Sequence, residues 1–431
     1  MKYIIIFNMN SLLIKKFNYP KDLIRVGVPA SKSVLNRALI LSALSHGTVR
    51  LLCGSFGEDT RALLACLKAL GIKTETQEEE IVVHGCGGNI PNKNAELNVM
   101  SAGTAARFLT VALAFCGGNY RMRSSAQMEK RPMEVLRMLE GAGVEIVYEK
   151  EPEHFPFQLH SSGINTDCLT VNTDESTQYA SGVLLAATAL SRPLTLILTG
   201  SRTHGSYIEM TLKLLGDFGV NYAQSDRTVT VFPAPLPPKR YEIEPDLSGA
   251  CYFYALSLLF STKVLVCRTH ENSIQGDFRF LNLLREKGVK LVQTEEGLLA
   301  DGTRISEYDG FTADMKDFSD QTLTVAALAP FATTPTELRG IAHIRLQECD
   351  RIHAIRENLK TLGVSTEWNG EMLTIYPATD IKAGHVKTYD DHRVAMAFAL
   401  IGLKTGVVTI ENPLCCKKTF DNYFDLIGLL N

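Results

Sequence analysis

The chain has 431 residues, of which 45% are hydrophobic and 21% charged, and its formal net charge is −3. This length exceeds what one ordinary core holds, so about two to three domains are expected. The near-neutral charge argues against a general nucleic-acid binder, which would carry a basic face or tail, and no run reaches the roughly 20 apolar residues that span a membrane.

The cysteines and the N-terminal run indicate the compartment. The ten cysteines include no C-x-x-C pair, and Cys415 and Cys416 are adjacent, which suits neither a zinc site nor an ordinary disulfide. Free thiols in a reducing cytoplasm are therefore expected. The apolar run Tyr3–Phe7 is short and lacks both a basic flank beyond Lys2 and a small-residue cleavage site, so no signal peptide is predicted.

The first informative segment is Pro29–Arg37, with the sequence P-A-S-K-S-V-L-N-R. Its proline ends an apolar, strand-like run, and the small hydroxyl residues that follow predict a helix start. Lys32 lies in the first turn of this helix and Arg37 further along. Backbone N–H groups at a helix start are unpaired and attract anions. Together with the two cations they predict a phosphate or carboxylate site.

One pattern recurs at intervals of roughly 70 residues and predicts about six repeated units. An amphipathic helix ends at a glycine, which suits the left-handed conformation after a helix, and an apolar residue then begins a strand. Each unit also contains a helix that is apolar on nearly all faces, which is typical of burial. The glycines are Gly71, Gly143, Gly219, Gly288 and Gly363, with a weaker copy at Gly428. The apolar helices are predicted at 35–45, 105–115, 181–190, 250–260, 323–331 and 394–403, and strands at 194–198, 228–232, 264–267 and 407–410.

The units predict an α/β protein of two pseudo-symmetric domains with three units each. Five prolines interrupt the segment 233–246, which is the predicted hinge. The first strand can complete the C-terminal half, so the chain is expected to cross between the halves near 28–30. The predicted domains are 30–245 and a discontinuous one made of 1–29 and 246–431.

Several later segments place polar or charged side chains at helix starts, where each also allows a simpler interpretation as a capping turn or a solvated ion pair. Glu348 and Arg351 are three residues apart and are expected to face the same side of a helix. His392 has no second histidine at ligand spacing, so it is interpreted as structural rather than as a metal ligand. The segments are 101–107, 129–132, 176–179, 320–322, 345–351, 390–393 and 416–420.

Taken together, these segments resemble one family, the 5-enolpyruvylshikimate-3-phosphate (EPSP) synthases of the shikimate pathway. The resemblance covers nearly the whole chain, and it implies two domains, each of three βαβαββ units, with ligands in the cleft between them. It also implies transfer of a carboxyvinyl group from phosphoenolpyruvate to shikimate 3-phosphate. The motifs that carry the resemblance are S-K-S-x-x-N-R, A-G-T-A-x-R, K-R-P-M, S-T-Q, S-D-Q, E-C-D-R-I, D-D-H-R-x-A-M and K-K-T-F.

The resemblance implies three groups of site residues. The catalytic residues would be Asp320, Glu348 and Lys32. The residues that bind shikimate 3-phosphate would be Lys32, Ser33, Arg37, Ser176, Thr177, Gln178, His204, Tyr207, Asp320, His343 and Gln347. The residues that bind phosphoenolpyruvate would be Lys32, Gly103, Arg131, Gln178, Arg351, Arg393 and Lys418.

Some positions depart from the family pattern. His204 or Ser206 must serve where a serine usually meets the substrate phosphate, and His343 replaces an asparagine. Gln347 occupies a lysine position and so removes one positive charge from the site for shikimate 3-phosphate. Ala30 and Ser101 replace a glycine and an asparagine. These changes concern affinity and pose more than the type of reaction.

The two substrates are anions, so a ring of lysine and arginine is needed to offset their repulsion. Asp320 is expected to accept the proton of the 5-hydroxyl, and Glu348, helped by Lys32, to protonate the methylene carbon of the enolpyruvate. A tetrahedral intermediate would then expel phosphate. The reaction needs no metal or organic cofactor.

The expected protein is a cytoplasmic monomer whose partners are its two small-molecule substrates, without nucleic acid or membrane. Two alternatives stay open. One is a transferase acting on UDP-N-acetylglucosamine, although no cysteine lies near 122–131, where that enzyme needs one. The other is a homologue that binds shikimate 3-phosphate without turnover, for which Gln347 and His343 are the support.

Overall fold

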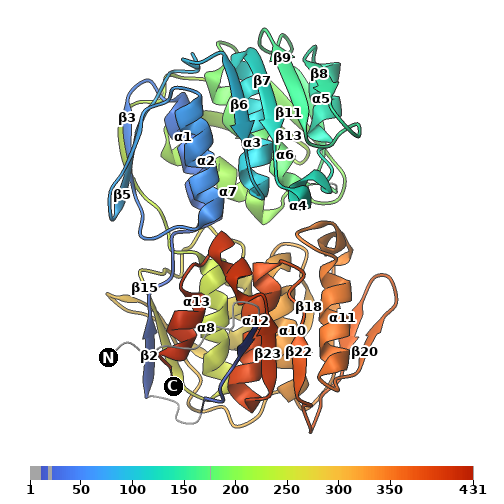
Figure 1. The fold of residues 1–431 in the computed structure, drawn as a ribbon. Helices are drawn as coiled ribbons and strands as arrows, with labels where there is room; N and C mark the ends of the chain where they lie inside the picture. The colour runs from blue at the N-terminus through green and yellow to red at the C-terminus, as the bar shows by residue number, and fades with distance from the viewer. Residues whose placement is uncertain (1–10, 18–21, 175, 431) are drawn as a thin grey trace. The chain divides into compact units, whose positions relative to one another are not determined.

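The computed structural model describes residues 11–17, 22–174 and 176–430 (Figure 1). The chain folds into two compact units. The continuous unit is Ala30–Glu244, and the discontinuous unit combines Met1–Pro29 with Pro245–Asn431. The run Tyr3–Phe7, for which no signal peptide is predicted, lies outside the described residues.

The continuous unit contains three four-stranded sheets among its described residues. In two of them, two strands joined through a helix pair in parallel, and a hairpin then adds two antiparallel strands, as in β6-α3-β7-α5-β8-β9. In the third, the parallel partner of β3 is β14, which comes from the end of the unit. The sheets are β14 (Lys239–Glu242), β3 (Thr48–Leu52), β5 (Glu80–His84) and β4 (Thr74–Thr76); β6 (Asn94–Asn98), β7 (Gly118–Arg123), β9 (Phe157–Ser161) and β8 (Glu145–Tyr148); β10 (Cys168–Asn172), β11 (Leu194–Thr199), β13 (Thr228–Phe232) and β12 (Asn221–Gln224). The helices are α1 (Lys32–Leu44), α2 (Glu58–Ala69), α3 (Gly103–Cys116), α4 (Ala126–Glu129), α5 (Val135–Gly141), α6 (Thr177–Ala186) and α7 (Ser206–Asp217).

The discontinuous unit repeats this plan, with two four-stranded sheets and one three-stranded sheet in its described part. The sheets are β16 (Lys290–Gln293), β17 (Gly297–Asp301), β15 (Lys263–Cys267) and β2 (Leu23–Val26); β18 (Thr312–Asp314), β19 (Thr336–Arg339), β21 (Leu373–Ile375) and β20 (Thr366–Trp368); β1 (Ser11–Leu13), β23 (Val408–Glu411) and β22 (Gly384–Val386). The helices are α8 (Leu247–Leu259), α9 (Phe278–Glu286), α10 (Thr322–Leu328), α11 (Arg351–Thr361), α12 (His392–Thr405) and α13 (Tyr423–Gly428), with short 3-10 helices η2 (Ser319–Gln321), η4 (Ala342–Leu346) and η5 (Pro413–Lys418). The α/β class with repeated βαβαββ units is therefore confirmed.

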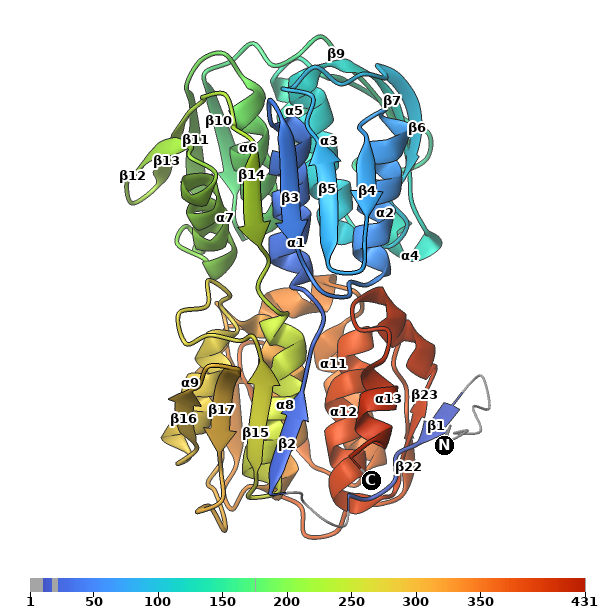
Figure 2. The ribbon, with the colours of Figure 1, turned by 90° about the vertical axis from the view of Figure 1, so that its left-hand side faces the viewer.

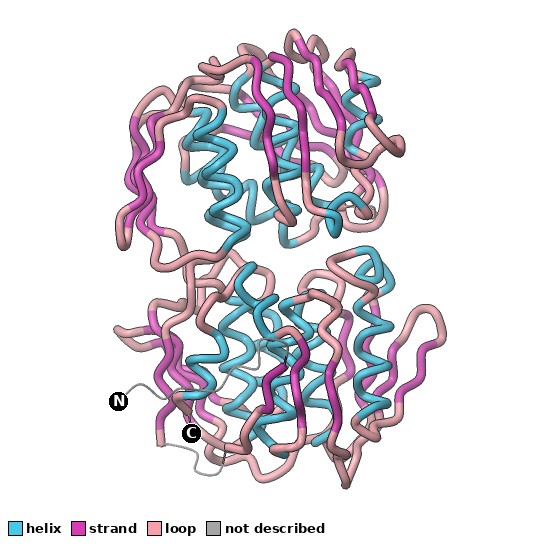
Figure 3. Tube along the Cα trace, in the orientation of Figure 1, coloured by secondary structure: helices cyan, strands magenta, loops and turns pink. Residues whose placement is uncertain are grey.

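The helices predicted to be apolar on all faces form the interior of each unit. Every residue of α8 is buried, and so is every residue of α3 except Cys116. Figure 2 shows α1 behind the sheet of β14, β3, β5 and β4, and Figure 3 shows the helices enclosed by strands within each unit. A helix covered on several sides can carry alanine and leucine all round, because each face removes apolar surface from water.

The glycine repeat is confirmed for five of its six copies. Gly71 follows α2 with φ of 78°, and the equivalent glycines after α5, α7, α9 and α11 have φ between 82° and 95°. The last copy differs, because Gly428 is the final residue of α13. All ten cysteines lie within the described ranges, and none of them forms a disulfide.

The chain passes from the discontinuous unit to the continuous unit after β2 and returns after β14. The early strand β2 pairs in parallel with β15 of the discontinuous unit, and the late strand β14 pairs in parallel with β3 of the continuous unit. The segment 233–246, which was predicted as the hinge, contains the strand β14. Its prolines flank β14, whose residues Lys239–Glu242 are not prolines and therefore carry the backbone N–H groups that strand pairing needs. In the described residues, no helix is long and apolar enough to cross a membrane.

Candidate active site

Arg351 is the centre of a charged cluster in the discontinuous unit. It is the first residue of α11, and its guanidinium is almost fully buried. Its Nη1 lies 2.8 Å from Asp320 Oδ1, its Nη2 3.0 Å from Glu348 Oε2, and its Nε 2.8 Å from Asp391 Oδ2. Burial lowers the pKa of Arg351, but the charges of the three carboxylates outweigh burial and hold the pKa above its ordinary value. Arg351 thus stays cationic and fixes three acids at once.

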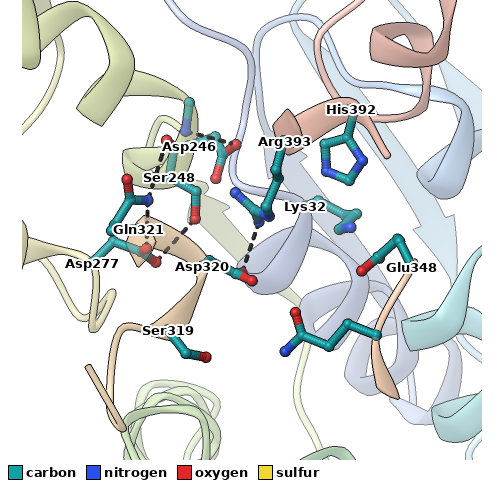
Figure 4. Close-up of polar contacts among 12 residues, drawn as sticks. Lys32, Asp246, Ser248, Asp277, Ser319, Asp320, Gln321, Glu348, His392 and Arg393 are labelled. Atoms are coloured by element: carbon teal, nitrogen blue, oxygen red, sulfur yellow. Dashed lines mark hydrogen bonds and ion pairs between the residues drawn. The ribbon is translucent and has the colours of Figure 1, made fainter. Parts of the chain in front are cut away.

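Asp320 lies in the η2 turn that leads into α10. Its Oδ1 is held by Arg351, and its Oδ2 lies 2.8 Å from Arg393 Nη2 on the first turn of α12 (Figure 4). Burial raises the pKa of Asp320, yet the charges of Arg393 and Arg351 outweigh it and hold the pKa below its ordinary range. Asp320 is therefore ionised at neutral pH. The interpretation of Asp320 as a simple helix cap does not hold, because both its oxygens pair with arginines.

Glu348 pairs with two cations from different elements. Its Oε2 meets Arg351, as the three-residue spacing predicted, and its Oε1 lies 3.8 Å from Lys418 Nζ at the end of η5. The expected placement on a shared helix face was wrong, because α11 begins only at Arg351 and Glu348 lies in the turn before it. This turn directs the Glu348 carboxylate toward the start of the helix.

Two of the departures from the family pattern, Gln347 and His343, lie at the edge of the same cluster. Gln347 Oε1 accepts a hydrogen bond from Arg351 Nη1. His343 Nε2 lies 3.0 Å from the hydroxyl oxygen of Ser319, the residue before Asp320. The structure therefore brings together six of the predicted site residues of this unit: Asp320, His343, Gln347, Glu348, Arg351 and Arg393, with Lys418 beside Glu348.

Asp391 belongs to the polar segment 390–393 at the start of a buried helix, but nothing in the sequence marks it as a functional residue. Its side chain is fully buried, accepts a hydrogen bond from Arg393 N at 2.9 Å and pairs with Arg351 Nε. It therefore caps α12 and holds Arg351 at the same time. Cys349 Sγ lies 3.6 Å from its Oδ2, and burial, then the charge of Asp391, raises the pKa of that thiol.

In the continuous unit, α1 carries the first predicted cations. Lys32 Nζ lies 3.1 Å from Asp59 Oδ2 on α2, a partner that the sequence did not indicate. Arg37 is 1% exposed and donates to Thr211 Oγ1 at 2.7 Å and to Ser181 Oγ at 3.0 Å. It also donates to the backbone oxygens of Ser33 at 2.8 Å and Tyr207 at 3.3 Å. These contacts link α1 to α6 and α7.

A second group of predicted residues gathers around the start of α3. Arg107 Nη1 donates to Gln178 Oε1 at 3.0 Å. A Cβ atom at Gly103 would come within 2.8 Å of Arg107 Nη1 and 3.0 Å of Arg131 Nη1, so a larger residue would require the guanidinium groups to shift. Ser176 caps α6 by accepting from Gln178 N at 3.2 Å, and Thr177 is buried in its first turn. The structure therefore places the predicted residues Gly103, Arg131 and Gln178 close together, and Arg107 belongs to the same group.

Among the described residues, no hydrogen bond, ion pair or ring contact joins His204 to Arg37. It is 52% exposed, and its Nε2 lies 3.2 Å from Asp226 Oδ1. Tyr207, by contrast, has its ring 5.7 Å from the Arg37 guanidinium carbon, and Phe108 lies at 5.0 Å on α3. Ser206 is the first residue of α7.

Replacing Arg37 with methionine is expected to change the free energy of unfolding by only about 1–2 kcal/mol, because its acceptors are hydroxyl and carbonyl oxygens. Burial, opposed by the charge of Tyr207, lowers the pKa of Arg37 to about 10. Keeping the charged guanidinium in the interior therefore costs free energy. Urea unfolding checks the expectation, and a loss above about 4 kcal/mol would contradict it.

The arrangement described here is that of an α/β enzyme for small anionic substrates, in which arginines and lysines at helix starts accompany buried carboxylates. The fold matches two solved structures of EPSP synthase from Acinetobacter baumannii, with TM-scores of 0.80 and 0.77, 21% and 20% sequence identity, and 98% coverage of both chains. The family model for EPSP synthase (3-phosphoshikimate 1-carboxyvinyltransferase) matches residues 24–427. The chain belongs to the EPSP synthase family.

Two relatives match this chain over nearly its full length. A 3-phosphoshikimate 1-carboxyvinyltransferase of Trichormus variabilis is 35% identical over 421 residues, which is 96% of this chain and 98% of the relative. A 3-phosphoshikimate 1-carboxyvinyltransferase 2 of Halalkalibacterium halodurans is 36% identical over 411 residues, or 94% of this chain and 91% of the relative. The resemblance stated from the motifs, the fold class and the expectation of a transferase enzyme are thereby confirmed.

Proposed function

We propose that the chain transfers the carboxyvinyl group of phosphoenolpyruvate to the 5-hydroxyl of shikimate 3-phosphate and releases phosphate, the reaction for which its relatives are named. The observation that carries this proposal is the placement of Asp320 between Arg351 and Arg393, with Glu348 on the other side of Arg351. An ionised acid beside two cations can accept a proton while the cations hold a phosphate or carboxylate.

Asp320 is the proposed base and Glu348, with Lys32, the proposed acid. Asp320 takes the proton of the 5-hydroxyl as that oxygen forms a bond to C2 of the enolpyruvate. Glu348 gives a proton to the methylene carbon C3, so the product of addition is a tetrahedral phospho-ketal. Elimination then breaks the bond between C2 and the phosphate oxygen, C3 returns a proton to Glu348 as the double bond forms again, and the departing phosphate takes the proton held by Asp320.

The remaining side chains are proposed as binding groups. Arginine suits this role because its planar fork donates two hydrogen bonds to one carboxylate or phosphate. For phosphoenolpyruvate we propose Lys32, Gly103, Arg131, Gln178, Arg351, Arg393 and Lys418. For shikimate 3-phosphate we propose Lys32, Ser33, Arg37, Ser176, Thr177, Gln178, His204, Tyr207, Asp320, His343 and Gln347. We also propose that the enzyme acts in the cytoplasm as a monomer, without a cofactor, nucleic acid or membrane.

The test is phosphate release with purified full-length protein. Release that requires both substrates, together with a product heavier than shikimate 3-phosphate by one carboxyvinyl group, is the expected result. Binding of shikimate 3-phosphate without phosphate release would favour the non-catalytic alternative. Release that depends on UDP-N-acetylglucosamine in place of shikimate 3-phosphate would favour the second alternative and overturn the proposal.

Replacing Arg393 with methionine is expected to raise the KM for phosphoenolpyruvate roughly 10- to 100-fold, the value of one or two charge-assisted hydrogen bonds. The matched control is Arg345→Met. Arg345 pairs with Asp350 at 3.1 Å but is 56% exposed, so its loss removes only a surface ion pair. Steady-state kinetics with varied phosphoenolpyruvate compares the two variants. Equal KM values in both would rule out a binding role for Arg393.

A further inference from the structure

A second buried carboxyl group lies behind the turn that carries Asp320. Asp277 directly precedes α9 and is 5% exposed. Its Oδ2 accepts a hydrogen bond from Ser248 Oγ of α8 at 2.9 Å, and its Oδ1 accepts one from Gln321 Nε2 at 2.7 Å (Figure 4). Ser248, Asp277 and Gln321 therefore form a closed polar group inside the discontinuous unit. None of the three belongs to the sites proposed above.

Gln321 connects this group to Asp320, its neighbour in the η2 turn. Gln321 is fully buried, and both ends of its side chain are engaged. Its Nε2 donates to Asp277 and, at 3.4 Å, to Ser248 O, while its Oε1 accepts from Thr324 Oγ1 at 2.8 Å. A side-chain amide held at both ends fixes the backbone from which it projects. The Asp277 carboxyl is thus the anchor of the turn that presents Asp320 to the arginines.

We propose that Asp277 is a positioning residue for the reaction, which holds Asp320 in place through Gln321 and tunes its proton affinity by charge. The inference rests on the role proposed for Asp320. A small displacement of a reacting group lowers the rate strongly, because the proton must be transferred over hydrogen-bond distance.

The electrostatic part of the inference follows from the groups that face Asp277. Burial and then the charge of Asp320 raise the pKa of Asp277 to about 6, against the opposing charge of Arg393 and the hydrogen bond from Gln321. Asp246 at the start of α8 adds to the rise, and the Cys251 thiol donates to the backbone oxygen of Asp277 at 3.7 Å.

Coulomb interaction is reciprocal, so an ionised Asp277 makes Asp320 a stronger base than a neutral Asp277 does. The wild-type kcat is therefore expected to fall in a step as the pH drops through about 6. A residue that does not change its charge over this pH range would leave no such step.

Two substitutions at Asp277 separate position from charge. Asp277→Asn keeps the size, can accept from Gln321 through Oδ1 and can donate to the Ser248 hydroxyl through Nδ2, but it has no charge. Asp277→Ala removes both the hydrogen bonds and the charge. At pH 8, Asp277→Ala is expected to lower kcat roughly 10- to 100-fold, with the KM values for both substrates within about threefold of wild type.

The Asn variant is expected to recover most of the kcat lost in the Ala variant and to lose the step near pH 6. Phosphate release over pH 5–9 by the full-length protein measures both effects, and circular dichroism confirms that each variant is folded. If the Ala variant does not fold, the kcat and the pH profile of the Asn variant test the inference. An Ala variant with the kcat of the wild type, or an Asn variant that keeps the step near pH 6, would overturn this inference and leave the proposed function standing. A wild-type protein that releases no phosphate would overturn the proposed function and this inference with it.

Discussion

Replacing Asp320 with asparagine is expected to lower kcat by roughly 10²- to 10⁴-fold, the usual contribution of a general base. Asparagine keeps the shape of the side chain but cannot accept the proton of the attacking hydroxyl. The KM for phosphoenolpyruvate is expected to stay the same or fall, because Arg351 and Arg393 then face a neutral group and are freer to bind an anion. The effect therefore falls on the chemical step rather than on binding.

The measurement is single-turnover phosphate release at saturating substrates, which separates chemistry from binding. The matched control is Asp317→Asn. Asp317 lies three residues earlier and pairs with Arg279 at 2.8 Å, but its side chain is 35% exposed and outside the arginine cluster. The kcat of the Asp317→Asn variant is expected to match that of the wild type. Near-normal turnover by the Asp320 variant would show that another group takes the proton and would remove Asp320 from the catalytic assignment.

Replacing Arg351 with methionine is expected to lower the free energy of unfolding by about 3–5 kcal/mol and to abolish measurable turnover. The substitution leaves Asp320, Glu348 and Asp391 without the cation that they share, and Asp391 is fully buried. Unpaired carboxylates in a protein interior are costly because water no longer solvates their charge. Urea unfolding followed by circular dichroism measures the loss.

The pH dependence of this loss tests its cause. In the wild type the arginines lower the pKa of Asp320, so its contribution to stability is present above the unfolded pKa and is lost as the pH falls through the lower folded pKa. In the Arg351→Met variant the carboxylates gain from protonation instead, so the difference in stability is expected to shrink between pH 7 and about pH 4. Arg37→Met is the matched control, because it removes an equally buried arginine whose acceptors do not titrate. A loss that is equal in the two variants and independent of pH would show that packing, not charge, is responsible.

Much of the fold was predictable because it depends on local signals. Glycines such as Gly71 and Gly363 adopt the left-handed conformation that ends a helix, and this conformation leaves a mark in the sequence at each repeat. The helices now called α3 and α8 were predicted because a helix covered on all sides has no polar face. The strand β14 was not predicted, because its short polar segment among prolines is stabilised by pairing with β3, far away in the chain.

The site was predictable where its residues belong to motifs. Asp320 and Arg393 stand at the start of apolar helices, and Glu348 belongs to the charged segment that precedes α11. Asp59 and Asp277 have no such signal. Asp59 is an ordinary acid in the first turn of α2, and Asp277 is an ordinary acid before α9. Only the folding of those helices against α1 and the η2 turn gives each its partner, Lys32 for Asp59 and Gln321 for Asp277.

The sequence by itself determined the α/β class, the repeated units, the buried helices and the family to which the motifs belong, because helix ends, strand patterns and motif spacing are properties of neighbouring residues. The tertiary structure alone decided that Arg351 holds three carboxylates and that Gln321 ties Asp320 to Asp277. The protonation state of a buried acid depends on charges that arrive from distant parts of the chain. Those distances exist only after the chain has folded.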